Sequence, residues 1–269
     1  MFENYQISNS TDKILSRFSL SLNEYANPIK RACTIVKGTK GYVITSESDR
    51  ELRRMKFGFT PHWAKTPMDI LTARAEGDKN LDNDPYYNGP NSIFLKPAFK
   101  KAIQHYRCLV VADSYVEDSS KQQQLIRFPE NNFPIVFAGI YDYWQDPDTK
   151  IISPGFAIIT VPASEILQQI GIKRMPVVLS FYNCTNWVKP QKPLNYYLPM
   201  LNRESTELIH VISLKDLLGK TGKQEQNENK SDQPSGPLPK RYYNKRQLHT
   251  PYDNSTMGER IEREKLLNS

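Results

Sequence analysis

The sequence predicts an α+β protein with a mixed sheet or barrel-like β core and a few flanking helices. Two observations lead to this prediction. Short runs of β-branched and aromatic residues recur up to about residue 218, whereas segments with helical apolar spacing are few. Many short strands with few helices are typical of a sheet that closes, or nearly closes, on itself.

Runs of β-branched, aromatic and apolar residues predict the strands. Residues 34–36 and 41–45 are β-rich runs bounded by Lys and Gly, which predicts two strands of a hairpin-like unit. The stretch 52–59 alternates in polarity and carries a glycine near its end. Continuous apolar runs, which are typical of strands buried on both faces, occupy residues 108–112, 134–141, 156–161 and 176–180.

Three short helices are expected. Ser10 opens a stretch with N-cap chemistry before residues 13–18. Residues 97–103 begin with proline and then follow helical spacing. Residues 163–170 also come directly after a proline, and helical spacing is expected to place three apolar residues on one face: Ile166, Leu167 and Ile170.

The remaining segments divide the chain into a domain and a tail. Residues 77–91 form a polar loop with Asp-Pro and Gly-Pro turn signals. Residues 1–218 are expected to form one domain, and residues 219–269 a polar, basic tail that is largely disordered. Within this tail, 240–246 mixes basic and aromatic residues, and 258–267 has the pattern of a short charged helix.

Composition narrows the classes of partner. The chain of 269 residues carries a formal charge of +7 and a pI near 9.1, which is compatible with a polyanionic partner without identifying one. No apolar stretch approaches the roughly 18 residues that a membrane span requires, so no membrane association is expected. The amino-terminal residues lack a basic run followed by an apolar core, which predicts a cytoplasmic protein.

The cysteines and histidines give no sign of a metal site. The three cysteines, Cys33, Cys108 and Cys184, are widely spaced and form no Cys-x-x-Cys pair, so inert buried thiols are the simplest interpretation. The four histidines, His62, His105, His210 and His249, also lack the spacing of metal ligands. Neither a metal nor another cofactor is expected.

Eight segments, read in order, resemble the SOS-response-associated peptidase (SRAP) family. Residues 57–63 match its Trp-Gly-x-x-Pro-x-Trp signature, with Phe57 in place of the first Trp. Residues 71–76 match its Asn-Ala-Arg-x-Glu block, and residues 107–113 its Arg-Cys-Leu-x-x-Ala-Asp segment. The other matching segments are 96–99, 114–117, 137–144, 158–160 and 174–179. The tail from residue 219 on has no counterpart in this pattern.

The resemblance implies a fold and a reaction. The fold would be a mostly antiparallel, barrel-like β core with a groove for DNA. In active members, a cysteine at position 2 becomes amino-terminal after removal of the initiator Met. Its amine and thiol capture the aldehyde of an abasic site as a thiazolidine, which is a covalent protein–DNA link, and nearby Asn, Glu and His residues assist proton transfer.

Three of these four catalytic positions are substituted in this chain. Phe2 stands where the family has its nucleophilic cysteine, so thiazolidine chemistry is impossible at this terminus. Thr72 replaces the asparagine, and Ile172 replaces the histidine. Only the glutamate is retained, as Glu117. The pattern indicates loss or redirection of the reaction, and the peptidase activity in the family's name is therefore uncertain here.

Other retained residues point to DNA. The resemblance places Arg74 at a phosphate contact, and Trp63 and Tyr115 near the bound strand. Lys100 and Lys101 lie in a basic cluster that would add salt-sensitive affinity, together with Lys96 and Arg107. Structural roles remain open for the same residues: Arg74 as a buried ion-pair residue, Trp63 as a core residue, Glu117 as a partner of Arg74 or Arg107, and the lysines as a solvated helix face.

Three functions are consistent with these residues. The favoured one is a monomeric, non-covalent binder of single-stranded DNA, including strands with abasic sites. The second is an enzyme in which an amine, either the Met1 α-amino group or Lys173, forms a Schiff base with the abasic aldehyde while Glu117 moves protons. The third is an interaction protein that retained the fold and lost DNA binding.

Overall fold

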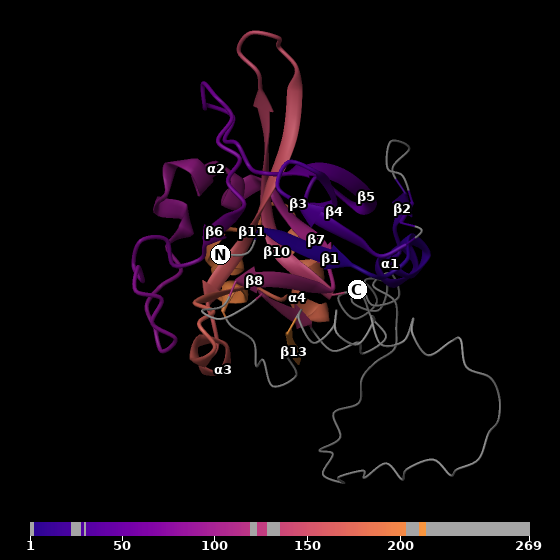
Figure 1. Ribbon diagram of the computed structural model, residues 1–269. Coiled ribbons are helices and arrows are strands. Elements are labelled where there is room, and N and C mark those ends of the chain that lie inside the picture. Colours follow the sequence, from indigo (N-terminus) through magenta and orange to yellow (C-terminus); the bar gives the residue numbers. More distant parts are fainter. Residues whose placement is uncertain are drawn as a thin grey trace, which may run out of the picture.

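The computed structural model describes residues 3–22, 28–29, 31–118, 123–127, 135–202 and 210–213. In this part of the chain, the strands form two sheets (Figure 1). The smaller sheet has the order β13-β9-β8-β1-β3 and the larger one β12-β11-β10-β7-β4-β5-β2, with β6 added beside β11. The smaller sheet comprises β1 (Asn4–Ile7), β3 (Cys33–Val36), β8 (Ser114–Asp118), β9 (Gln123–Arg127) and β13 (His210–Ser213).

The larger sheet closes into a barrel. Its strands are β2 (Ser21–Leu22), β4 (Lys40–Thr45), β5 (Ser48–Phe57), β6 (Thr72–Arg74), β7 (Arg107–Ala112), β10 (Ile135–Gln145), β11 (Ile152–Pro162) and β12 (Arg174–Pro176). Antiparallel pairing runs from β11 through β10, β7 and β4 to β5, and a short parallel pairing joins β5 back to β11. The predicted α+β fold with a barrel-like β core is thereby confirmed.

Five α-helices flank the described sheets: α1 (Thr11–Phe18), α2 (Pro97–His105), α3 (Glu165–Gln169), α4 (Phe181–Val188) and α5 (Leu194–Tyr197). Two 3-10 turns, η1 (Ile93–Leu95) and η2 (Leu198–Leu201), complete the helical set. The expected N-cap before α1 is confirmed, because the Ser10 hydroxyl accepts a hydrogen bond from the Lys13 N–H. Within the described residues, no helix is long and apolar enough to cross a membrane.

The predicted buried strands form the core. All six residues of β7 are buried, as the continuous apolar run predicted, and most of β10 and β11 is buried as well. Helix α4, which the sequence reading did not identify, packs against β7, and the Trp187 indole N–H donates to the Cys108 carbonyl over 3.0 Å. Cys108 and Cys184 are buried as expected, and Cys33 is partly buried.

Three local predictions were wrong. The strands at 34–36 and 41–45 do not form a hairpin, because β3 pairs with β1 while β4 pairs with β5 and β7. The strand expected at 176–180 is the shorter β12, which ends at Pro176. In α3, Leu167 is buried but Ile166 is 68% exposed, because this five-residue helix presents only one side to the core.

Candidate functional site

A buried ion pair lies beneath the polar loop at 77–91. The Arg174 guanidinium binds both carboxylate oxygens of Glu76, at 2.5 and 3.1 Å. It also donates to the Thr160 hydroxyl and carbonyl oxygens and to the Asn83 side-chain oxygen. These five bonds engage all five N–H donors of the guanidinium. Arg174 is therefore fully committed to structure, and it links β12, β11 and the loop.

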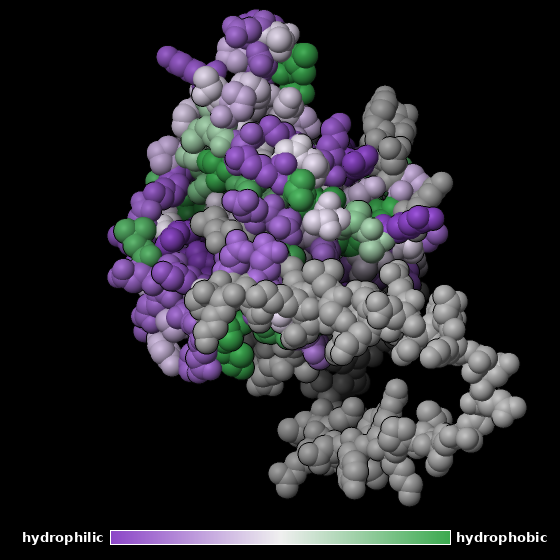
Figure 2. Space-filling model, in the orientation of Figure 1, coloured by the Kyte–Doolittle hydropathy of each residue, from purple (hydrophilic) through white to green (hydrophobic). Residues whose placement is uncertain are grey.

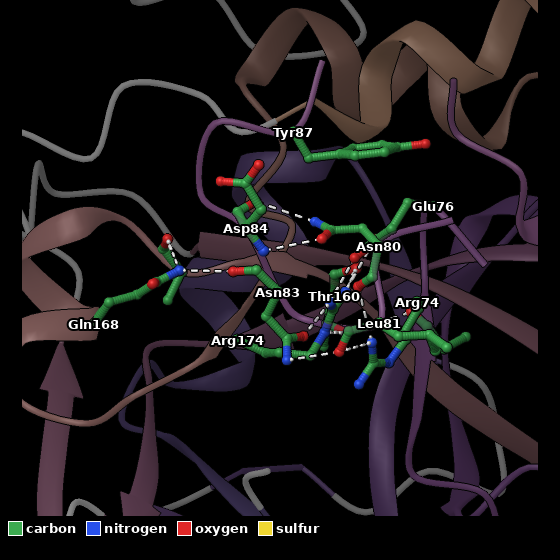
Figure 3. Close-up of polar contacts among 12 residues, drawn as sticks. Arg74, Glu76, Asn80, Leu81, Asn83, Asp84, Tyr87, Thr160, Gln168 and Arg174 are labelled. Atoms are coloured by element: carbon green, nitrogen blue, oxygen red, sulfur yellow. Dashed lines mark hydrogen bonds and ion pairs between the residues drawn. The ribbon is translucent and has the colours of Figure 1, made fainter. Parts of the chain in front are cut away.

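The loop is held by side chains from two directions (Figure 3). The Asn80 side chain bonds to the backbone of Asp84 through both its oxygen and its nitrogen, at 2.9 and 3.0 Å. The Gln168 amide donates to the Asn83 carbonyl over 3.0 Å. Asn83 itself adopts a positive φ of 60°, a conformation that asparagine tolerates better than most residues. These contacts fix a long polar loop whose residues have little apolar surface to bury.

Arg74 lies under the same loop but is less committed than Arg174. Its Nη1 donates to the carbonyl oxygens of Asn80 and Leu81, at 3.1 and 3.4 Å, and the side chain is half-buried. Burial, followed by the neighbouring Arg174 charge, lowers the pKa of Arg74, although an arginine stays cationic at neutral pH. The buried ion pair considered for Arg74 is instead formed by Glu76 and Arg174.

A cavity of about 330 Å³ opens beside this ion pair. Its walls include Glu76, Tyr87, Asn88, Val161 and Asn202. In Figure 3 the Tyr87 ring lies on the Glu76 side of the loop. The cavity is lined by both polar and apolar groups, and through Glu76 it adjoins the block at 71–76.

Trp63 is exposed on a tightly held loop between β5 and β6. Of the three tryptophans in the chain, Trp144 and Trp187 are buried, whereas Trp63 is 53% exposed. The loop is closed at its base by paired backbone bonds between Phe59 and Ile70, and the Trp144 indole N–H donates to the Ala64 carbonyl over 2.8 Å. The structure therefore excludes the core role for Trp63 and keeps its ring accessible on a rigid support.

Two residues expected near DNA lie in the core instead. Tyr115 is fully buried and makes an edge contact with Phe137, because β8 is covered on the face that this ring occupies. Its expected role as a stacking aromatic is therefore corrected. Arg107 is 1% exposed, so it is removed from the predicted basic cluster.

Arg107 has a structural role that its sequence context did not suggest. Its guanidinium donates to the carbonyls of Ile103 and Gln104, near the end of α2, and to those of Trp187 and Lys189, at the end of α4. These are groups that helix ends leave without intrahelical partners. One buried cation thus satisfies the carboxyl ends of two helices.

The lysines of the predicted cluster remain at the surface. Lys100 and Lys101 are exposed on α2, and the Lys101 ammonium lies 5.2 Å above the Tyr106 ring. Lys96 forms an ion pair with Asp78. The face of the molecule in Figure 2 is mainly hydrophilic, with small separate apolar areas among the residues drawn in colour.

The positions of the family's catalytic residues divide between the two sheets. Glu117 lies in β8 and is 5% exposed; burial raises its pKa, and the nearby Asp118 and Glu3 carboxylates act in the same direction. Antiparallel pairing of Asn4 with Val116 brings Glu3, the first described residue, beside it. Thr72 is half-buried in β6, and Ile172 is fully buried before β12. Phe2 and the amino group of Met1 lie outside the described residues.

Several site residues were not identified from the sequence. The sequence predicts no role for Glu76 and Arg174, although both lie in segments that match the family. A buried arginine requires a carboxylate partner. His62 was read only as a non-ligand, and Asp142 received no role, yet they bond to each other. Within the described residues, no group of His, Cys, Asp and Glu side chains is arranged to hold a metal ion. The tail features at 219–269, with His249, lie outside the described residues.

Comparison with known proteins identifies the family of the chain. The profile of a family described as "SOS response associated peptidase (SRAP)" matches residues 1–221. The abasic site processing protein YoqW of Bacillus subtilis (strain 168) is 28% identical over 167 residues, which are 59% of this chain and 66% of that protein. The abasic site processing protein HMCES of Gallus gallus is 29% identical over 157 residues, 49% of this chain and 43% of that protein. The chain therefore matches less than two thirds of the length of these relatives.

Solved structures share the fold. A protein from Bacteroides thetaiotaomicron superposes with a TM-score of 0.64 at 23% identity, covering 80% of this chain and 94% of that one. A protein from Bordetella bronchiseptica superposes with a TM-score of 0.59 at 16% identity, covering 79% of this chain and 99% of that one.

Proposed function

The chain belongs to the SOS response associated peptidase (SRAP) family, and from this premise we propose that it is a DNA-damage-response protein that binds single-stranded DNA, including strands with abasic sites, without forming the thiol-dependent crosslink. The domain at residues 1–218 would carry this activity as a monomer in the cytoplasm. The relatives' description as abasic site processing proteins supports the substrate class.

The observation that carries the proposal is the exposed, rigidly held Trp63. An accessible indole accepts any base by stacking, which suits binding without sequence preference. Arg74 is half-buried and retains its charge near the surface, and Lys100 and Lys101 add exposed positive charge. Tyr115 and Arg107 do not contribute to the proposed DNA-binding surface, because both are buried.

The loss of the crosslink rests on the substituted positions. Phe2 has no thiol, and Thr72 and Ile172 carry neither an amide nor an imidazole. The remaining cysteines are poor substitutes: burial raises the pKa of both Cys33 and Cys108, which disfavours the reactive thiolate. Cys33 also lies within the chain, at the start of β3, and not at an amino terminus that could complete a thiazolidine ring.

Replacing Trp63 by alanine is expected to weaken binding to a single-stranded oligonucleotide by about 1–3 kcal/mol, because one base-stacking contact is lost. The change removes no charge, so the dependence of log Kd on log salt should keep its slope. Fluorescence anisotropy at several salt concentrations measures both quantities.

The matched control is Tyr182→Ala, which removes another exposed aromatic ring, 65% exposed on α4. It should leave the affinity unchanged. Equal losses for both variants would contradict a specific stacking role for Trp63. If the wild-type protein does not bind at low salt, the DNA-binding proposal fails and the interaction-protein function becomes the better one.

A second function is supported by Glu117. Burial raises the pKa of this glutamate, which suits it to proton transfer. Glu117 also lies beside Glu3, so the first described residues are its neighbours. An amine near this position could form a Schiff base with an abasic aldehyde, and Lys173, which is exposed next to Ile172, is the other candidate amine.

Borohydride reduction of a mixture with an abasic oligonucleotide tests this second function. If an amine reacts, reduction should trap a covalent band, and Glu117→Gln should slow its formation. Blocking the amino terminus and Lys173→Arg would show which amine forms the bond. We expect no band, because the favoured function is non-covalent. A covalent band at stoichiometric protein would contradict the non-covalent function and support the enzymatic function.

A further inference from the structure

His62 and Asp142 form a dyad at the foot of the Trp63 loop. The Asp142 side chain is 3% exposed, and its Oδ2 accepts the His62 backbone N–H and lies 2.9 Å from His62 Nδ1. Its Oδ1 accepts the Tyr143 backbone N–H over 2.8 Å. Asp142 therefore ties the loop to β10 and at the same time fixes the orientation of the imidazole ring.

This geometry assigns a role to each ring nitrogen. Oδ2 already accepts a hydrogen bond from the His62 backbone N–H. We assign Oδ2 as the acceptor for the ring as well, so that Nδ1 carries the hydrogen. The other nitrogen, Nε2, is then the one left for contacts outside the loop. The His62 side chain is 40% exposed, unlike its buried partner. When the ring takes up a proton, it does so at Nε2, which becomes a charged donor beside the exposed Trp63.

The neighbouring residues suit a nucleic-acid strand. Residues 62, 63 and 65 carry an imidazole, an indole and an ammonium on one loop and are exposed, while Ala64 between them is buried and anchored. The Thr60 hydroxyl accepts N–H groups from Met68 and Asp69, at 3.1 and 3.3 Å, which fixes the return of the loop. A base stacked on an indole brings its own phosphates within reach of adjacent cationic side chains.

We propose that His62, oriented by Asp142, binds a phosphate of single-stranded DNA next to the base stacked on Trp63, and that it takes up a proton when it does so. The proposal rests on the proposed DNA-binding function and adds a specific contact to it. A neutral Nε2 offers a phosphate only a lone pair, so the contact forms with the protonated ring.

Charged side chains near the ring come from β10 and from the loop itself. Asp142, from β10, contacts it directly. Lys65 lies on the same loop, and Asp69 at the end of the loop is held by Lys56 of β5 over 2.6 Å. Asp142 places its carboxylate on the Nδ1 side of the ring, and Lys65 adds positive charge to the same loop. Asp69 is neutralised by its own partner, so it does not oppose an incoming strand.

The test compares wild type, His62→Gln and His62→Lys in binding single-stranded oligonucleotides between pH 8 and pH 6. Wild-type affinity should rise as the pH falls, because only the protonated ring can donate from Nε2 to a phosphate while Nδ1 donates to Asp142. His62→Gln should bind about ten-fold more weakly than wild type at pH 6 and almost equally at pH 8. His62→Lys should bind well at both pH values, because its charge is permanent.

A second measurement locates the phosphate. Oligonucleotides with one uncharged methylphosphonate, moved stepwise along the strand, should reveal a position at which wild type at pH 6 loses affinity and His62→Gln does not. His105→Gln, on α2, serves as the control for other histidines. Thermal unfolding shows whether each variant is folded.

The outcomes separate this inference from the proposed function. If wild type binds with affinity that rises at low pH, and His62→Gln abolishes the rise while His62→Lys removes the pH dependence, the contact is supported. If His62→Gln binds like wild type at both pH values, the contact is overturned and DNA binding by Trp63 stands. If wild type does not bind single-stranded DNA at any pH, both are overturned.

Discussion

Glu76→Ala is expected to lower the free energy of unfolding by about 3–5 kcal/mol, because it leaves the charge of a buried arginine without its carboxylate. Arg174 is 4% exposed and Glu76 1% exposed, so water cannot replace the lost partner. The guanidinium would keep its bonds to Thr160 and Asn83, but two of its five donors would lose their acceptors. The loss is large because the penalty falls on an unpaired ion and not only on a missing contact.

Chemical denaturation with a fluorescence readout measures this effect. Asp78→Ala, which breaks the exposed pair with Lys96 in the same loop, is the matched control and should cost no more than about 1 kcal/mol. Similar small losses for both variants would show that Arg174 relaxes toward solvent. A folded Glu76→Ala should also bind DNA more weakly, because Arg74 donates to the loop that Arg174 holds.

Gly155→Val is expected to open the barrel, at a cost of about 3 kcal/mol or more. Gly155 pairs with Lys56 where β5 meets β11, the one parallel junction that closes the ring of strands. A Cβ at this position would collide with the Gly58 carbonyl oxygen. Gly58 is itself held by its N–H bond to the Phe156 carbonyl, so backbone and not a movable side chain meets the new group.

Near-UV circular dichroism and thermal unfolding report on this junction, because Phe57 and Phe156 stack across it with ring centroids 5.4 Å apart. Ser153→Ala, two residues earlier on the same strand, should change stability by less than about 0.5 kcal/mol. A Gly155→Val protein with wild-type stability would mean that β5 and β11 can separate without disturbing the rest of the barrel.

The sequence determined the features that depend on local pattern or on residue identity. The strands at 108–112 and 156–161 were predictable, because a continuous apolar run favours a strand that is buried on both faces. The helix after Ser10 followed from its cap, whose hydrogen bond spans three residues. The identity of residue 2 is equally direct, because Phe2 carries no sulfur whatever surrounds it.

The tertiary structure decided which polar and aromatic side chains face solvent. Trp63 is exposed while Tyr115 is buried, although both lie in segments that matched the family. Arg174 is buried because its carboxylate partner, Glu76, comes from a segment 98 residues away. Arg107 is buried because the end of α4, about 80 residues away, supplies two of its acceptors. The same holds for His62 and Asp142, which are 80 residues apart. Local sequence reports apolar periodicity and caps, whereas the exposure of a side chain depends on what the folded chain packs against it.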